Sequence, residues 1–237
     1  MTEVVVCGAG GFIGGHLIAD LRREGRFELR AVDVKPMDEW FQVFDDVDNR
    51  VLDLSERDAC REAVAGSRYI FNLAADMGGM GFIEANKALC MLSVLINPHR
   101  LLAAREEGVE RYFFASSACV YAAEKQTDAA VRPLAEADAY PAMPEDGYGW
   151  EKLFSERMAR HFMEDFGIQT RVARYHNEEV RLSMALQFSV GSSATSVRYR
   201  PVPPPRASPG SAAPRSGVGQ HVGQQDPHRQ DEIEEAL

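Results

Sequence analysis

Two side chains in the middle of the chain have the types and the spacing of a proton-transfer pair. Tyr148 and Lys152 lie in a segment that we expect to be helical, so their separation places both on the same face. An ammonium beside a phenol stabilises the phenolate and lowers a pKa that is ordinarily about 10. We therefore predict that Tyr148 is a general base or acid near neutral pH, with Asp146 capping the helix. The alternative is a spacing that arose by chance.

A second set of reactive side chains precedes this helix in the sequence. Ser117 and Cys119 belong to the segment Ser116–Tyr121, which continues an apolar stretch that we expect to be a strand. In a parallel sheet, the carboxyl end of a strand and the start of the next helix meet at one edge, so both side chains should lie near Tyr148. A thiol with a pKa of about 8.5 can exchange a proton near working pH. The alternative for Cys119 is a small buried apolar residue.

Near the N-terminus, Gly8, Gly11 and Gly14 have the spacing G-x-x-G-x-x-G between an expected strand and an expected helix. A pyrophosphate needs backbone approach without side chains, and it gains from the N–H groups at a helix N-terminus. We expect Phe12 and Ile13 to line the same phosphate site. The spacing departs from the plain G-x-G-x-x-G, and a tight structural turn is the alternative interpretation.

Acidic residues follow the next two expected strands. Asp33 ends the second strand, where a carboxylate accepts hydrogen bonds from a ribose diol and repels a 2′-phosphate, which favours NAD over NADP. Asp53 and Leu54 end the third strand, at the place where an adenine would lie. A solvated loop acid is the alternative for Asp33, and a purely structural role is equally open for Asp53 and Leu54.

These residues require a particular order of strands and helices. We expect strands at 3–7, 29–34, 50–52, 69–75, 111–116 and 169–174, and helices at 12–24, 55–64, 83–107 and 147–166. Ser55 is expected to cap the second helix and Pro98 to kink the third. Six alternations of strand and helix predict an α/β fold, a doubly wound parallel Rossmann sheet.

Composition excludes several classes of protein. The chain has 237 residues and a net charge of −10, which argues against non-specific binding to nucleic acid. No apolar run approaches the roughly 18 residues that a membrane span needs. Four scattered cysteines without metal-ligand spacing indicate reduced thiols, a cytoplasmic location and no metal.

The chain changes character after residue 177. Seven of its twelve prolines fall between residues 201 and 227, among Gly, Ser, Arg and Gln. A segment so poor in large apolar side chains cannot offset the entropy of ordering itself. We therefore expect two parts: a nucleotide-binding domain at 1–177 and an aberrant, largely disordered tail at 178–237, with the substrate domain of related folds missing or replaced.

Four motifs resemble one known family. They are NLAADMGGMGF (Asn72–Phe82), SSACVY (Ser116–Tyr121), DGYGWEK (Asp146–Lys152) and RYHN (Arg174–Asn177). Over residues 1–177 the chain resembles the extended short-chain dehydrogenase/reductases, the NAD-dependent epimerase/dehydratase family. Within it, the first motif is similar to members that epimerise GDP-mannose at two carbons. The resemblance implies NAD, a nucleotide-sugar substrate and a possible homodimer.

The resemblance also implies roles for single residues. Tyr148 would be the base of the hydride step, Lys152 would hold the nicotinamide ribose, Ser117 would bond the sugar 4-hydroxyl, Cys119 would be one epimerisation acid/base, and Gly78 and Asn177 would contact the substrate. The implied reaction oxidises the sugar at C4, epimerises C3 and C5, and then reduces C4 again, so no net redox change occurs.

Beyond Asn177 the family pattern is not followed. The family continues with a loop that carries a second acid/base lysine and with a small substrate domain, whereas this sequence has no lysine after Lys152. We therefore expect a crippled epimerase, from a truncated or frameshifted gene. The alternatives are a non-catalytic NAD-binding fragment and a sugar-nucleotide 4-epimerase or 4,6-dehydratase; the AADMGGMGF string and Cys119 argue against the last of these.

Overall fold

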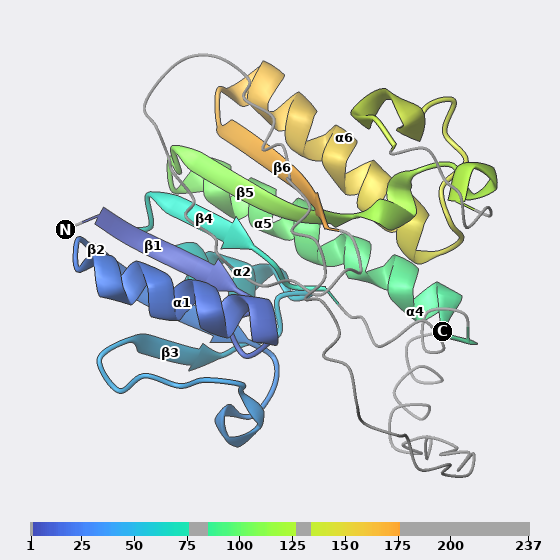
Figure 1. The fold of residues 1–237 in the computed structure, drawn as a ribbon. Helices are drawn as coiled ribbons and strands as arrows, with labels where there is room; N and C mark the ends of the chain where they lie inside the picture. The colour runs from blue at the N-terminus through green and yellow to red at the C-terminus, as the bar shows by residue number, and fades with distance from the viewer. Residues whose placement is uncertain (1, 76–84, 127–133, 176–237) are drawn as a thin grey trace, which may run out of the picture. The chain divides into compact units, whose positions relative to one another are not determined.

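The computed structural model describes residues 2–75, 85–126 and 134–175. Within them, six parallel strands form one sheet in the order β3-β2-β1-β4-β5-β6 (Figure 1). The strands are β1 (Thr2–Cys7), β2 (Phe27–Asp33), β3 (Asp48–Val51), β4 (Tyr69–Asn72), β5 (Arg111–Ser117) and β6 (Gln169–Tyr175). The strand order reverses between β1 and β4, which confirms the predicted doubly wound Rossmann sheet.

Helices cover both faces of this sheet, as Figure 1 shows. Alternate residues of β1 enter two different cores, Val4 and Val6 on one side and Val5 and Cys7 on the other, and all four are fully buried. Helix α1 (Phe12–Glu24) packs on the first side. On the second side lie α2 (Arg57–Val64), α5 (Ile96–Glu106) and α6 (Tyr148–Phe166). A strand buried on both faces explains the uninterrupted apolar run at the start of the sequence.

The single long helix predicted before β5 is interrupted. Helix α4 (Lys87–Leu92) leads into a 3-10 turn, η2 (Ser93–Leu95), and α5 begins at Ile96. Pro98 has no N–H to donate to the carbonyl four residues earlier, and its ring would collide with that carbonyl. The interruption therefore lies one turn before the proline, where the α-helical hydrogen bonds fail. Of the described helices, none is long and apolar enough to cross a bilayer.

Shorter 3-10 turns shape the connections. They are η1 (Met37–Glu39), η3 (Ala118–Val120), η4 (Ala123–Gln126) and η5 (Glu136–Ala139). The connection that follows β5 packs against α6 through a small apolar cluster of Val120, Tyr121, Ala139 and Leu153. This cluster anchors the segment carrying Ser117 and Cys119 to the helix that carries Tyr148.

Two predicted helix caps are wrong. Helix α2 begins at Arg57, and the hydroxyl of Ser55 instead donates to Asp53 Oδ1 at 2.7 Å, because that carboxylate is its nearest acceptor. Helix α6 is preceded by Gly147, with a φ of +44°, while the Asp146 carboxylate accepts from the Gly147 N–H at 2.9 Å and pairs with Lys87. Asp146 therefore lies one residue before the N-cap of α6, where it holds the preceding turn through Gly147 and Lys87.

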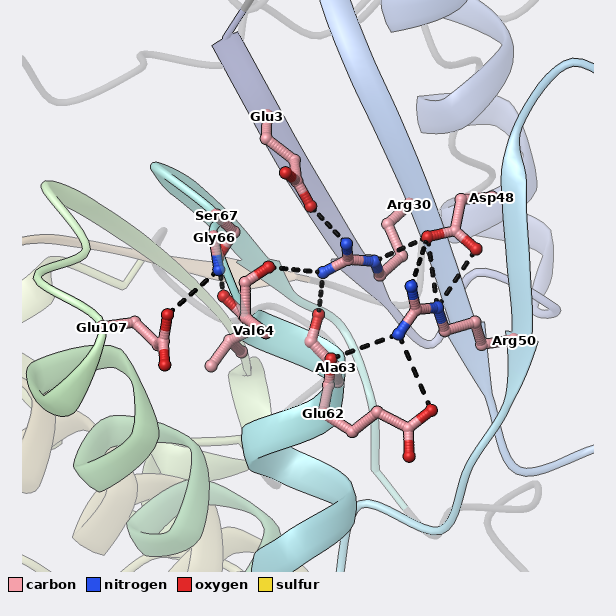
Figure 2. A network of polar contacts seen from close by, with 11 residues as sticks. Glu3, Arg30, Asp48, Arg50, Glu62, Ala63, Val64, Gly66, Ser67 and Glu107 are labelled. Carbon is pink, nitrogen blue, oxygen red and sulfur yellow. Dashed lines mark hydrogen bonds and ion pairs between the residues drawn. The ribbon is translucent and has the colours of Figure 1, made fainter.

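A buried guanidinium ties several elements together at some distance from the predicted site residues. Arg30 of β2 contacts Glu3 of β1 and Asp48 of β3, and donates to the carbonyls of Ala63 and Ala65 at 2.9 Å each (Figure 2). The carbonyls at the end of α2 carry partial negative charge, so a cation there satisfies both the helix end and the two carboxylates. The network joins β1, β2, β3 and α2.

Candidate functional site

The glycine turn that follows β1 closes tightly on its neighbours. Gly8 has a φ of +84°, and its N–H donates to the carbonyl of Val32 at 2.8 Å. A Cβ on Gly8 would lie 2.8 Å from backbone atoms of Leu73 and Ala74, and a Cβ on Gly14 would lie 2.1 Å from Gly8 O. Close packing of the turn against the end of β4 and against α1 therefore requires glycine at both positions.

Gly11 occupies the open side of the same turn. It precedes α1 as the N-cap, no side chain caps the helix there, and a Cβ on Gly11 would meet only Gly8 O, at 3.4 Å. The first helical turn begins with Phe12, which is half exposed, and Ile13, which is partly buried. A helix N-terminus without a side-chain cap attracts anions, so the turn fits the pyrophosphate of a dinucleotide.

Asp33 lies where the sequence predicts it, at the end of β2 beside the glycine turn. Its carboxylate is buried and accepts from the N–H of Gly10 at 2.9 Å and from that of Lys35 at 3.1 Å. A Cβ on Gly10 would lie 2.7 Å from the indole of Trp40, so Trp40 holds Gly10 against the carboxylate. The structure thus brings the expected ribose-binding acid to the expected phosphate-binding turn.

The two residues predicted at the adenine edge differ from each other. Asp53 is exposed, and its Oδ1 accepts from the N–H and the hydroxyl of Ser55 at 2.9 and 2.7 Å. Leu54 is buried in the core on the α2 side of the sheet. Both are accounted for by the turn between β3 and α2, and their contact with a cofactor stays a prediction.

Tyr148 and Lys152 lie on the first turns of α6, as predicted, and both are buried. The ammonium of Lys152 lies 5.3 Å from the centre of the Tyr148 ring and 5.1 Å from that of Phe114, on β5. Its charged partner is Glu151, whose Oε2 is 3.2 Å from Lys152 Nζ. Phe114 pairs with Asn72 across β4 and β5, and Asn72 pairs with the residue before Gly8, so the lysine lies level with the glycine turn.

The expected lowering of the Tyr148 pKa is wrong: the pKa is raised. Burial raises the pKa of the Tyr148 phenol above its ordinary value, and the charge of Glu151 adds to that rise, while a hydrogen bond with Ser117 opposes it. The physical reason is that loss of water around the buried phenol has the largest effect, and the negative charge of Glu151 acts in the same direction. Burial therefore favours the protonated phenol, and the role of Tyr148 as general base or acid stays a prediction.

Ser117 ends β5, and Cys119 lies two residues further in η3, with its N–H 3.3 Å from Ser117 Oγ. A Cβ on Gly149 would lie 2.4 Å from the carbonyl oxygen of Cys119, so the first turn of α6 packs directly on this segment. Ser117, Cys119 and Tyr148 are thus brought together. Burial raises the pKa of the Cys119 thiol to about 11, which corrects the ordinary value expected from the sequence.

Two predicted substrate residues, Gly78 and Asn177, lie outside the described residues, as do residues 83–84 of the expected helix and the whole of 178–237. Sequence reasoning also missed a set of polar side chains beneath the site: Asn72, Asn97, Arg100, Glu151 and Ser155, all buried. Asn97 and Arg100 share a helix face with the buried Leu101 and Ala104. Polar residues at core positions of an amphipathic helix were the signal that could have identified them.

The fold and the site together define a dinucleotide-binding domain of the Rossmann type. Residues 4–179 match the NAD dependent epimerase/dehydratase family, and the chain belongs to that family. The cofactor expected from the sequence, NAD, is the one on which this family depends.

Individual proteins are similar to the same part of the chain. It is 43% identical over 176 residues to GDP-mannose 3,5-epimerase 1 of Oryza sativa subsp. japonica, a match covering 74% of this chain and 46% of that protein. A solved UDP-galactose 4-epimerase has 28% identity and a TM-score of 0.61, over 73% of this chain and 56% of that one. A solved short-chain dehydrogenase/reductase superfamily protein of Agrobacterium tumefaciens with bound NAD has 27% identity and a TM-score of 0.60, over 73% and 48%. The chain spans about half the length of the curated relative that it matches.

Proposed function

We propose that this chain is an NAD-dependent nucleotide-sugar epimerase that acts on GDP-mannose and carries out only part of the double epimerisation. The observation that carries the proposal is the grouping of Ser117, Cys119 and Tyr148 at the carboxyl edge of the sheet. A hydroxyl, a thiol and a phenol are the groups needed to bind a sugar hydroxyl, move a carbon-bound proton and move a hydroxyl proton.

The cofactor end of the site supports NAD. A pyrophosphate would lie at the N-terminus of α1, over Gly11, and the adenosine ribose would reach Asp33. The buried carboxylate of Asp33 accepts hydrogen bonds from a free 2′-hydroxyl and would repel a 2′-phosphate. We expect tighter binding of NAD than of NADP.

The chemistry that bound NAD supplies is reversible hydride transfer at C4 of the sugar. The residues of this chain handle the protons: Ser117 bonds the 4-hydroxyl, Tyr148 exchanges the proton of that hydroxyl, and Lys152 holds the nicotinamide ribose. Oxidation at C4 acidifies the hydrogens on C3 and C5. The thiol of Cys119 exchanges a proton with one of these carbons.

The second carbon has no matching base in the sequence. The resemblance implies a lysine for that step, and the chain has none after Lys152. Loss of one general acid or base commonly lowers a rate by ~10²–10⁴-fold. We therefore propose C4 oxidation and hydrogen exchange at one carbon, with full 3,5-epimerisation below detection.

The test is incubation of the purified chain with NAD and GDP-mannose in D₂O. Absorbance at the reduced-nicotinamide band reports C4 oxidation, and mass spectrometry with NMR locates deuterium and identifies product sugars. We expect slow reduction of NAD and deuterium at one of the two carbons. Full 3,5-epimerisation at an ordinary rate would reject the partial reaction.

Two variants separate the steps. Tyr148→Phe should abolish both absorbance change and exchange, because C4 oxidation precedes every later step. Cys119→Ser should keep the absorbance change and lose the exchange. Clear NAD binding with neither signal, in wild type as in both variants, would favour the alternative of a non-catalytic NAD-binding fragment.

We also propose that the chain forms a homodimer. Large apolar side chains are exposed on α4, η2 and α6, which lie next to one another: Met91, Leu92, Leu95, Trp150, Phe154 and Phe166. Large apolar side chains exposed on neighbouring elements are typical of a protein interface.

A further inference from the structure

Glu151 is a fully buried carboxylate that none of the proposed catalytic steps uses. It precedes Lys152 in α6, and the side chains of the two residues are 0% and 2% exposed. Glu151 Oε2 lies 3.2 Å from Lys152 Nζ, an ion-pair distance, and accepts no hydrogen bond from the described residues. Leaving an ionised carboxylate inside a protein costs several kcal/mol unless it is paired and hydrogen-bonded. The position of this carboxylate therefore needs an explanation.

The other oxygen of Glu151 is held by neutral groups. Glu151 Oε1 accepts from the Asn97 side-chain amide at 2.7 Å and from the Ser155 hydroxyl at 2.8 Å. Asn97 comes from α5, so the carboxylate is held by two helices at once. The ammonium of Lys152 thus lies beside one oxygen of the carboxylate, and two neutral donors bond the other.

The hydrogen bonds continue from Asn97 to a second buried cation. Asn97 Oδ1 accepts from the Asn72 amide at 2.6 Å, and Asn72 Oδ1 accepts from Arg100, whose guanidinium is fully buried. The spare donor of Asn72 reaches the hydroxyl of Tyr112 at 2.8 Å. Two amide dipoles thus point the same way, from the guanidinium to the carboxylate.

This direction is fixed by the end groups. A guanidinium has only donors and an ionised carboxylate has only acceptors, so each amide between them must turn its oxygen towards Arg100 and its N–H towards Glu151. Aligned bonds in a chain strengthen one another, and a low local dielectric increases the effect. Glu151 therefore lies between two cations, Lys152 in direct contact and Arg100 through Asn72 and Asn97.

We propose that Glu151 is a positioning residue that, held by this chain of bonds, fixes the ammonium of Lys152 beneath Tyr148. The proposal rests on the proposed function, in which Lys152 holds the nicotinamide ribose. Among the described residues, the other groups around the Lys152 ammonium are the aromatic rings of Phe114 and Tyr148, so Glu151 is the group that ties the lysine to the hydrogen bonds beneath the site.

The charge of Glu151 has a second consequence at Tyr148. The groups that face the phenol are Glu151 and Lys152 from α6, Ser117 from β5, Cys119 from η3 and Cys90 from α4. Glu151 is the one carboxylate among them, and its charge raises the pKa of the phenol. Neutralising Glu151 should lower the pKa of Tyr148, because an opposing charge is removed and the Lys152 ammonium is left without its partner.

The first experiment observes the lysine directly. The chain has four lysines, and Lys152 is the only buried one. In a ¹⁵N-lysine-labelled protein, the Lys152 ammonium should give a slowly exchanging ¹H–¹⁵N signal near neutral pH, assigned by its loss in Lys152→Met. In Glu151→Gln the exchange should be at least about tenfold faster, because the ion pair is lost. A wild-type spectrum without this signal, or an unchanged signal in Glu151→Gln, would overturn the proposal.

The second experiment measures the pH profile of C4 oxidation. Glu151→Gln should shift its acid limb to lower pH by about one unit. Ser155→Ala is the matched control, since it removes one bond to the same carboxylate but keeps the charge, and its profile should not move. Glu151→Asp should restore the wild-type limb and the slow lysine exchange, and it replaces the glutamine variant if that variant does not fold. If Glu151 had only a structural role, all three substitutions would lower stability, and the pH profile of C4 oxidation would be the same in each variant as in wild type.

The two experiments separate this proposal from the proposed function. The lysine spectra need neither cofactor nor sugar. Slow exchange that depends on Glu151, in a chain that never oxidises a sugar, would reject the proposed function and leave the pairing intact. Active C4 oxidation with a lysine signal indifferent to Glu151 would reject the positioning role alone.

Discussion

Gly11 and Gly14 belong to the same turn, yet a side chain would have different consequences at each. A Cβ on Gly14 would collide with the backbone of Gly8 and Ala9, at 2.1 and 2.7 Å, because α1 begins in contact with the turn. A Cβ on Gly11 would meet only Gly8 O, at 3.4 Å, and would project into the space at the helix N-terminus. Gly11 therefore leaves room for the proposed ligand, and Gly14 allows α1 to pack against the turn.

These positions give a matched pair of variants. Gly11→Val should fold, since the backbone of Gly11 has a negative φ that any residue adopts, and should lose NAD binding because its side chain takes the place of the phosphates. Gly14→Ala should lower the free energy of unfolding by about 1–3 kcal/mol, the usual cost of an overpacked core. Calorimetric titration with NAD and thermal unfolding measure both. Equal NAD affinity in Gly11→Val and wild type would contradict the phosphate role of this turn.

Cys119 is predicted to be a poor nucleophile at neutral pH. Burial raises the pKa of its thiol to about 11, a contact with Glu145 adds to the rise, and a hydrogen bond with Ser117 opposes it. Because the thiolate is the reactive form, alkylation by iodoacetamide should be slow near pH 7 and should increase about tenfold per pH unit towards 11. Glu145→Gln should speed alkylation at fixed pH. Cys119→Ser identifies the site by mass spectrometry, and a rate that levels off near pH 8 would contradict the raised pKa.

At the scale of the elements, the sequence predicts the sheet well because short apolar runs are unambiguous when both faces of a strand are buried. All six strands and helices α1 and α6 lie within a few residues of their expected bounds. The helix around Pro98 is less well predicted, because the loss of one hydrogen bond moves the interruption to η2, a turn earlier. The caps at Ser55 and Asp146 were misplaced because a local carboxylate or a lysine from another element determines each of them.

The site follows the same pattern. The glycine turn, Asp33 and the pair of Tyr148 and Lys152 could be predicted because each depends on residues close together in the sequence. The chain through Asn97 could not, because the contact of Asn97 with Glu151 joins α5 to α6 across more than fifty positions. The pairing of Lys152 with Glu151 and the direction of the shift in the pKa of Tyr148 were missed because both depend on how deeply α6 is buried, and burial raises the pKa of the phenol.

The contacts of Arg30 predict how much its buried charge contributes to the free energy of unfolding (Figure 2). Arg30→Met removes the cation from Glu3, leaves Asp48 with Arg50 alone and leaves two carbonyls without a donor, so the free energy of unfolding should fall by about 3 kcal/mol. Arg50 is the matched control, since it contacts the same Asp48 from a position 30% exposed. Arg50→Met should cost below about 1 kcal/mol. Chemical denaturation measures both, and equal losses would show that burial of Arg30 adds nothing.

At the scale of the whole molecule, α6 exposes apolar side chains. A groove along α6 is lined by Phe154, Met158, Phe162 and Phe166, together with Arg157, His161 and Asp165. Beside it, α4 and η2 expose Leu92 and further apolar side chains. Removing such surface from water contributes about 25 cal/mol per Å². A two-fold dimer buries the same patch on both copies, so a single mutation acts twice.

The proposed homodimer follows from this geometry and can be tested by charge. Phe154→Glu combined with Leu92→Glu places two carboxylates on each copy of the patch, so a dimer would bring four together in an apolar contact, which is strongly unfavourable. Light scattering after size exclusion should give a dimeric mass for wild type and a monomeric mass for the double variant.

Met37→Glu, an exposed apolar position in η1, is the control and should stay dimeric. NAD affinity should be the same in all three proteins, because none of the substituted residues belongs to the glycine turn or to the proposed site. A wild-type chain that is monomeric at micromolar concentration would reject the dimer. The apolar face of α4 and α6 would then be covered by another part of the same chain or by a different protein.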